Sequence, residues 1–247
     1  MKPSELRRHQ QRGSYDLESV SSVFNDTFMA HVSYVDKGLP QCLPMIALFH
    51  KVGGVTSVYL HGHPSARLME LVRQNKNEDG TEKREKIKVC ITATKVDGLV
   101  LSSAPNGHTF NYRCAVVHGE CTQETDLGLK REIMKGVTNH IVADRWEDVN
   151  PVASFQVSLV CVLRVNIESM SGKSRTGIPG IQPRDREKDG PDREEPVWTG
   201  VVPLYDVLDR PVESGLTNGA RIPDSLEAYI GRRNDKHKEY SLKVAKL

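Results

Sequence analysis

The segment from Val58 to Arg67 contains residue types that suit the binding of an anion. It reads Val-Tyr-Leu-His-Gly-His-Pro-Ser-Ala-Arg, an apolar stretch followed by His63-Pro64-Ser65, and this pattern predicts a strand that leads into a short helix. Backbone amides at a helix N-terminus favour an anion, and an arginine adds a bidentate positive charge. Ser65 and Arg67 are therefore candidate phosphate ligands, with His61 and Gly62 beside them. The alternative is an ordinary capped helix with a surface arginine.

Four further segments resemble, together with the first, segments of a known family, and it is this resemblance that makes their residues candidates for a binding pocket. Two cations and an indole can clamp a phosphate and cover a ring, although an ordinary strand, a basic loop and a core tryptophan give the same pattern. The candidates are Val89, Cys90, Ile91 and Thr92 in one predicted strand, Tyr112 and Arg113 at the start of another, Lys173 and Arg175 in a basic stretch, and Trp198.

In this order, the five segments resemble FMN-binding split β-barrel proteins of the pyridoxamine 5'-phosphate oxidase-like superfamily. The likeness is to the branch of flavin-nucleotide-binding and nitroimidazole-resistance proteins. It implies that FMN lies between the two subunits of a homodimer, with backbone amides of 89–92 along the edge of the flavin ring. The matching segments are 58–67, 88–101, Asn111-Tyr112-Arg113, Lys173-Ser-Arg-Thr-Gly-Ile-Pro179 and Val197-Trp-Thr-Gly-Val-Val-Pro-Leu204.

The sequence departs from the family pattern at several positions. Leu68 stands where related proteins usually have a second cation after the phosphate arginine, and Ser103 stands where an arginine is frequent. Cys114 replaces the serine that follows Asn-Tyr-Arg in the family. The Arg-x-His substrate element of the namesake enzyme has no counterpart here, so oxidation of vitamin B6 is not predicted.

The leading prediction is an FMN-dependent oxidoreductase that acts on a small organic substrate, with NADH or NADPH as electron donor. His61, His63 and His108 are the candidate acids or bases, because histidine titrates near neutral pH. The alternatives are a non-catalytic flavin- or haem-binding protein, and a split barrel that has lost its flavin and serves other chemistry.

Other nucleotide and metal motifs are not supported. Ser171-Gly172-Lys173-Ser174 imitates the end of a P-loop, but Ile167 stands where the first glycine belongs, and no G-x-G-x-x-G is present. The histidines at 31, 50, 61 and 63 lack the spacing of a zinc site, so no metal is predicted. A net charge of +2 gives no reason to expect nucleic acid as a partner.

Composition indicates a globular protein that does not cross a membrane. Of 247 residues, 38% are hydrophobic and 27% charged, and no apolar run approaches the roughly 18–20 residues that a membrane span needs. The five cysteines are interpreted as reduced thiols of an intracellular protein, and four of them are expected in apolar surroundings, namely Cys42, Cys90, Cys114 and Cys161. The ending Ala245-Lys246-Leu247 is one residue away from a peroxisomal address, so we expect a cytoplasmic or peroxisomal location.

Hydrophobic periodicity predicts a mainly β fold, a Greek-key-like antiparallel barrel with flanking helices. A helix capped by Ser14 or Asp16 is expected over 16–25, with further helices after His63 and over 127–146, and a polar loop is expected over 177–196. We expect a flexible arm over 1–14, the barrel domain over 15–207 and a turn-rich surface extension over 208–247. The predicted strands are 27–35, 41–52, 56–60, 88–95, 99–101, 112–123, 155–167 and 197–207, with turns at Asp36-Lys37-Gly38 and Asp97-Gly98.

Overall fold

The structure is a computed structural model that describes residues 4–77, 79, 81, 83, 85–182 and 195–247. Most of the predicted loop 177–196 therefore lies outside the described residues. The chain divides into two compact units, a first unit of residues 1–94 and 114–173 and a second unit of residues 95–113 and 174–247. In this division, residues 95–113 and 174–207 group with the C-terminal residues.

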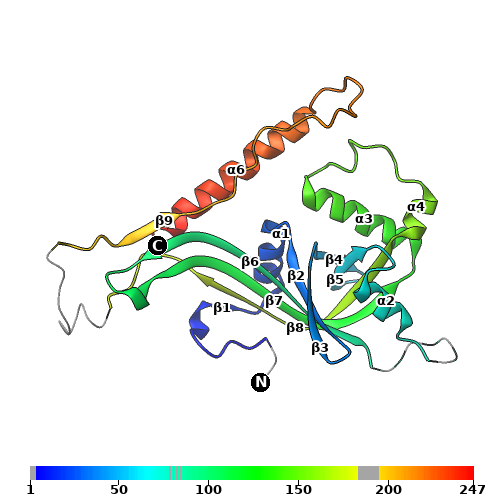
Figure 1. The fold of residues 1–247 in the computed structure, drawn as a ribbon, viewed down its shortest axis with the longest axis horizontal. Coiled ribbons are helices and arrows are strands. Elements are labelled where there is room, and N and C mark those ends of the chain that lie inside the picture. Colours follow the sequence, from blue (N-terminus) through cyan, green and yellow to red (C-terminus); the bar gives the residue numbers. More distant parts are fainter. Residues whose placement is uncertain (1–3, 78, 80, 82, 84, 183–194) are drawn as a thin grey trace. The chain divides into compact units, whose positions relative to one another are not determined.

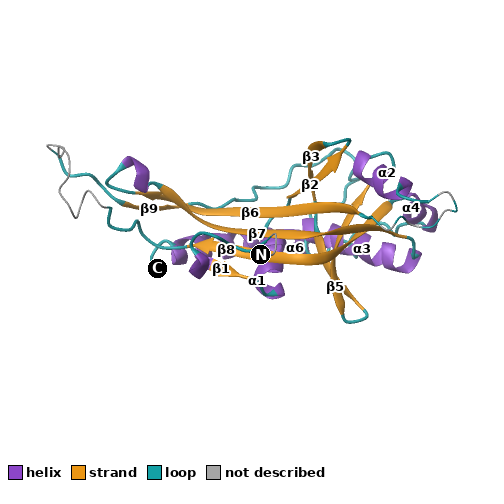
Figure 2. Cartoon of the chain, turned by 90° about the horizontal axis from the view of Figure 1, so that it is seen from below, coloured by secondary structure: helices purple, strands orange, loops and turns teal. Residues whose placement is uncertain are grey.

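The described strands form one sheet, and this confirms the predicted mainly β class. Its order is β3-β2-β6-β7-β8-β5-β4, with β1 paired to β8 and β9 paired to β6. Figure 2 shows β6, β7 and β8 as long neighbouring ribbons. The strands are β1 (Gly13–Ser14), β2 (Ala30–Asp36), β3 (Leu39–Met45), β4 (Leu48–Val52), β5 (Val55–Gly62), β6 (Ile87–Leu101), β7 (Thr109–Glu124), β8 (Cys161–Arg175) and β9 (Gly200–Pro203).

Along the chain, the described helices alternate with groups of these strands, and the last helix follows β9 near the C-terminal end (Figure 1). The first begins at Leu17 because the side chain of Asp16 accepts a hydrogen bond from the Ser19 amide at 2.7 Å, so Asp16 rather than Ser14 is the cap. The helices are α1 (Leu17–Asp26), α2 (Arg67–Gln74), α3 (Leu127–Ile141), α4 (Ser154–Leu159) and α6 (Asp224–Val244), with 3-10 turns over Gln10–Arg12 and Pro105–Gly107.

The core of the first unit is enclosed by the sheet and two helices. Val32 of β2 and Leu60 of β5, far apart in the strand order, are both fully buried in one hydrophobic cluster. Phe24 of α1 and Leu68 of α2 belong to the same cluster. Strands from both halves of the sheet therefore face one core, so the sheet is rolled around it.

Several predicted boundaries are wrong. The expected strand 41–52 is two strands, β3 and β4, and the strand expected over 155–167 begins instead as helix α4 and becomes β8 at Cys161. Asp97-Gly98 was expected to form a turn but lies inside the continuous β6, where Gly98 pairs with Pro203 of β9. A Cβ on Gly98 would lie 3.0 Å from a methyl group of Val201, so the close crossing of β9 explains the glycine.

Helix α6 is the main feature of the second unit, and it corrects the expectation of a turn-rich extension over 208–247. Residues 204–222 run back beside it (Figure 1), and the Asn234 side chain bonds the backbone of Leu208 through two 2.8 Å hydrogen bonds. The buried residues of α6 recur at helical spacing but are mostly polar. They are Arg233, His237, Ser241 and Val244.

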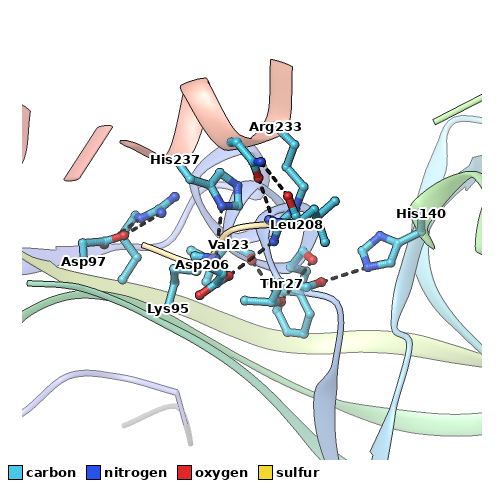
Figure 3. Close-up of polar contacts among 12 residues, drawn as sticks. Val23, Thr27, Lys95, Asp97, His140, Asp206, Leu208, Arg233 and His237 are labelled. Atoms are coloured by element: carbon cyan, nitrogen blue, oxygen red, sulfur yellow. Dashed lines mark hydrogen bonds and ion pairs between the residues drawn. The ribbon is translucent and has the colours of Figure 1, made fainter. Parts of the chain in front are cut away.

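Polar contacts attach α6 to β6 within the second unit. Lys95 is 6% exposed, and its ammonium group donates to Asp206 and to Nδ1 of His237, the latter at 3.2 Å (Figure 3). Because an ammonium group only donates, Nδ1 of His237 is the acceptor in this contact. Arg233 also contacts Asp206, at 3.3 Å.

The five cysteines form no disulfide. Cys121 and Cys161 are buried, and Cys90 and Cys114 are partly buried. Cys42, expected in apolar surroundings, is exposed. Within the described part of the chain, no helix has the length and apolar character that a membrane crossing requires.

Candidate functional site

The predicted anion-binding segment lies in the first unit, where β5 leads into α2. Gly62 is the last residue of β5, and a Cβ there would lie 3.1 Å from the terminal methyl of Met69, so glycine lets α2 approach the strand. The residue before α2 is Ala66, which has no side chain able to cap the helix. The first amides of α2 are thus left without a side-chain acceptor, an arrangement that favours an anion.

Two of the predicted residues contact each other in the loop before α2. The Ser65 amide donates to Nδ1 of His63 at 3.2 Å, and the Ser65 hydroxyl lies 2.7 Å from the same nitrogen. Nδ1 is therefore an acceptor, and a neutral His63 carries its proton on Nε2. The Ser65 hydroxyl must rotate away from His63 before it can donate to another group.

Arg67 is already paired with two carboxylates. Its Nε and Nη2 donate to the two carboxylate oxygens of Asp36 at 2.7 and 2.8 Å, and Nη1 donates to Glu70 at 3.0 Å. Hydrogen bonds from Arg67 hold the pKa of Asp36 below its ordinary value, despite the opposing effect of burial. The charge of Arg67 is therefore largely balanced in this conformation.

The neighbouring position cannot supply a second cation. Leu68 is fully buried in the hydrophobic core, so the departure from the family pattern at this position is a core-packing residue. Sequence reasoning missed a different cation on the same helix, Arg73. Its Nη2 donates to the carbonyl oxygen of Pro64 at 2.8 Å, and its Nε is buried without a hydrogen-bond partner in the described part of the chain. The only signal in the sequence is that Arg73 follows residues 61–66 within the helix predicted after His63.

His61 is half-buried on β5, and burial lowers the pKa of its imidazole. The ring is therefore neutral at pH 7 and able to accept a proton. Its backbone pairs with Val162 of β8.

The strand predicted to line a ring is an interior strand of the sheet. Cys90, Ile91 and Thr92 of β6 pair with Ser33, Val32 and His31 of β2, and β7 lies on the other side. Val89 and Ile91 are buried in the core, whereas Cys90 and Thr92 face the opposite side and are half-buried. Because the ladder to β2 uses the backbone groups along that edge, Cys90 and Thr92 offer side chains rather than free amides.

Lys173 belongs to the first unit and lies near the N-terminal segment. It pairs with Gly13 of β1, and its ammonium group donates to the carbonyl oxygen of Arg8 at 3.2 Å. It is not among the residues that contact Arg67 or Ser65 through a described hydrogen bond.

The remaining predicted residues belong to the second unit, where two of them make structural contacts. Arg113 forms a bidentate pair with Asp97 at 2.9 and 3.0 Å, and its guanidinium lies 4.0 Å from the centre of the Tyr240 ring. Arg175 donates to the buried Asn111 side chain and to the carbonyl oxygens of Gly177 and Ile178. Both arginine side chains are therefore held in place by contacts within the second unit.

Trp198, Tyr112 and His108 complete the set in the second unit. Trp198 is 65% exposed and lies just before β9, so it is not the core tryptophan considered above. Tyr112 is half-buried on β7, and Nδ1 of His108 lies 3.1 Å from the carbonyl oxygen of Ala104. No group of three or more potential metal-binding side chains occurs among the described residues.

A rolled antiparallel sheet with helices packed on it, and an uncapped helix after β5, defines a protein of the split-barrel class. The family model described as pyridoxamine 5'-phosphate oxidase matches residues 16–174, which is more than half of the chain. The chain belongs to this family. The match covers β5, α2 and the 89–92 strand.

Two solved structures share the fold over nearly the whole chain. The flavocytochrome Anf3 from Azotobacter vinelandii is 24% identical, with a TM-score of 0.72, and the alignment covers 91% of this chain and 94% of that one. The FAD and heme binding protein from Mycobacterium smegmatis is 20% identical, with a TM-score of 0.70 and coverages of 89% and 97%. No curated protein sequence matches this chain.

Proposed function

We propose that this protein binds a flavin nucleotide and acts as an FMN-dependent oxidoreductase on a small organic substrate. The observation that carries the proposal is the family match over residues 16–174, which includes the β5–α2 segment. The two similar structures also support flavin binding, since one is a flavocytochrome and the other binds FAD and haem.

The residues of the β5–α2 segment fit the phosphate of a flavin nucleotide in two respects. Helix α2 has no side-chain cap, and the buried Nε of Arg73 lacks a hydrogen-bond partner in the described part of the chain. Arg67 fits less well, because Asp36 and Glu70 balance its charge. We infer that the α2 amides and Ser65 bind the phosphate first, and that Arg67 contributes only when its pairing with Asp36 loosens.

A bound flavin supplies hydride transfer, and the protein supplies orientation and proton handling. His61 is neutral at pH 7 and is placed to accept a proton on the strand that leads to the phosphate segment. Cys90 and Thr92 offer polar side chains on the face of β6 that points away from the core. We propose NADH or NADPH as the electron donor and a homodimer as the working form.

The second candidate is a non-catalytic protein that binds flavin or haem. It is favoured by the two similar structures, since one is a flavocytochrome and the other binds FAD and haem. A neutral, half-buried His61 also suits an axial haem ligand. The third candidate, a barrel that has lost its flavin, is favoured by the carboxylate pairing of Arg67.

Titration of the purified protein with FMN, FAD and haemin distinguishes these candidates. Binding of FMN at 100 times its Kd should stabilise the fold by about 2.7 kcal/mol, which thermal unfolding detects. Bleaching of the bound flavin by NADH or NADPH without oxygen then supports an oxidoreductase. Flavin binding without bleaching supports the non-catalytic candidate. Failure of FMN and FAD to bind or to stabilise the protein contradicts the leading proposal.

A further inference from the structure

A cavity of about 740 Å³ lies in the first unit between the N-terminal segment and β8. On one edge of β8, residues 161–165 pair with β5 and residues 172–173 pair with β1. Within the described chain, no strand pairs with 166–171 on that edge, and Ile167–Met170 line the cavity there. Its size falls within the range of roughly 300–1,000 Å³ typical of small-molecule sites.

The N-terminal segment is fastened over this edge by several contacts. The Leu6 amide donates to the hydroxyl of Tyr15 at 3.1 Å, and Lys173 donates to the carbonyl oxygen of Arg8 at 3.2 Å. A Cβ on Gly13 would lie 2.6 Å from a methyl group of Leu6 and 3.1 Å from the carbonyl oxygen of Gln10, so a glycine at this position leaves room for the segment. The cavity is thus a built feature of the fold.

The cavity has an acidic rather than a basic lining. Glu5 and Glu168 contribute carboxylates, and no lysine or arginine is among the described residues that line it. Leu6, Ile167 and Met170 supply an apolar wall. Two carboxylates beside an apolar wall favour an organic cation over a phosphate or carboxylate as the group that contacts them.

A second, independent observation points to a ligand. Ser169 lines the cavity and is only 8% exposed, and its hydroxyl is buried without a hydrogen-bond partner in the described part of the chain. Buried hydroxyls are nearly always bonded, so an unsatisfied one calls for a missing partner such as a ligand or an ordered water.

We propose that this cavity binds a small organic cation, an amine with an apolar body. Its ammonium group meets the carboxylates of Glu5 and Glu168, its body packs on Leu6, Ile167 and Met170, and a polar atom satisfies Ser169. The cavity shares no residue with the β5–α2 segment, so the site is independent of flavin binding.

Three probes of similar shape test the charge preference by isothermal calorimetry on the full-length protein. They are 2-phenylethylamine, the neutral 2-phenylethanol and the anionic 3-phenylpropionate. The expected order of affinity is amine, alcohol, acid. Equal affinities, tighter binding of the acid, or no binding of any probe would overturn the proposal.

Matched variants locate the binding. Glu168→Gln should weaken amine binding about tenfold through the loss of one charge-assisted contact and leave alcohol binding unchanged. Glu18→Gln, which changes an exposed glutamate of α1 outside the cavity, should leave both unchanged. Ser169→Ala should raise or preserve the thermal stability of the free protein while it weakens the amine. An unchanged amine affinity in both Glu168→Gln and Ser169→Ala would contradict this location.

Discussion

Arg67 and Asp36 form a bidentate ion pair that joins α2 to the end of β2, with N–O distances of 2.7 and 2.8 Å. The pair connects residues 31 positions apart in the sequence. It occupies two of the donors that the family resemblance assigns to a phosphate. Arg67, the predicted phosphate ligand, is therefore already bound to a carboxylate, and a phosphate would compete with Asp36 for it. The effect of this competition on affinity is measurable.

Asp36→Asn should release Arg67 and tighten FMN binding several-fold, because the carboxylate no longer competes with the phosphate. Arg67→Ala should weaken FMN binding about tenfold. Quenching of flavin fluorescence during titration measures both constants. Glu70→Gln is the control for loss of a nearby carboxylate, with a smaller expected effect because Glu70 makes a single contact. Unchanged affinity in Arg67→Ala would remove Arg67 from the phosphate site.

Arg113→Ala should destabilise the second unit by about 3–5 kcal/mol, because it leaves the carboxylate of Asp97 buried without its partner. The Asp97 side chain is 5% exposed and that of Arg113 is 13% exposed. Urea denaturation measures the loss. The double variant Arg113→Ala with Asp97→Asn should recover part of it. A loss of flavin affinity with unchanged stability would instead place Arg113 at the cofactor.

The stability of the fold should fall as the pH drops below about 6.5, the ordinary pKa of histidine. Burial lowers the pKa of His61 in the folded protein, so the unfolded chain binds a proton more readily. This contribution is fully present above pH 6.5 and is lost progressively down to the folded pKa. His61→Gln should flatten the pH dependence over that window in urea titrations at a series of pH values. An unchanged slope would show that other groups produce it.

The five thiols should react in an order set by exposure. Cys42 is exposed and should react first with a thiol reagent, whereas burial raises the pKa of Cys121 to about 12 and should keep it unreactive until the protein unfolds. Mass spectrometry after timed alkylation identifies the sites. Cys42→Ser should remove the fast phase. Rapid labelling of Cys121 in the native protein would be inconsistent with its buried position.

Local signals in the sequence predicted the features that depend on neighbouring residues. Asp16 caps α1 because its side chain reaches an amide three residues away, and the Lys37-Gly38 turn takes positive φ values of 50° and 79°. The turn predicted at Asp97-Gly98 is wrong because Gly98 pairs with β9, a strand about a hundred residues later in the sequence. Helix α6 was missed because Arg233 and His237 occupy its buried face, so hydrophobic periodicity carries no signal there.

The candidate site was predicted in outline from residue types, whereas its partners were not. The β5–α2 junction follows from a strand pattern that ends at His63-Pro64. The pairing of Arg67 with Asp36, and of Arg113 with Asp97, depends on strands that meet only in the folded chain. The same holds for the cavity at Ser169, because it depends on where β5 and β1 stop pairing with β8.

The absorption spectrum of the purified protein, taken after incubation with excess FMN and removal of free flavin, tests the central proposal most directly. We predict the two bands of an oxidised flavin in the near-ultraviolet and blue, at close to one flavin per chain, and their loss on denaturation and filtration. A colourless protein that gains no thermal stability from FMN or FAD would contradict the account. A Soret band in place of the flavin bands would favour haem.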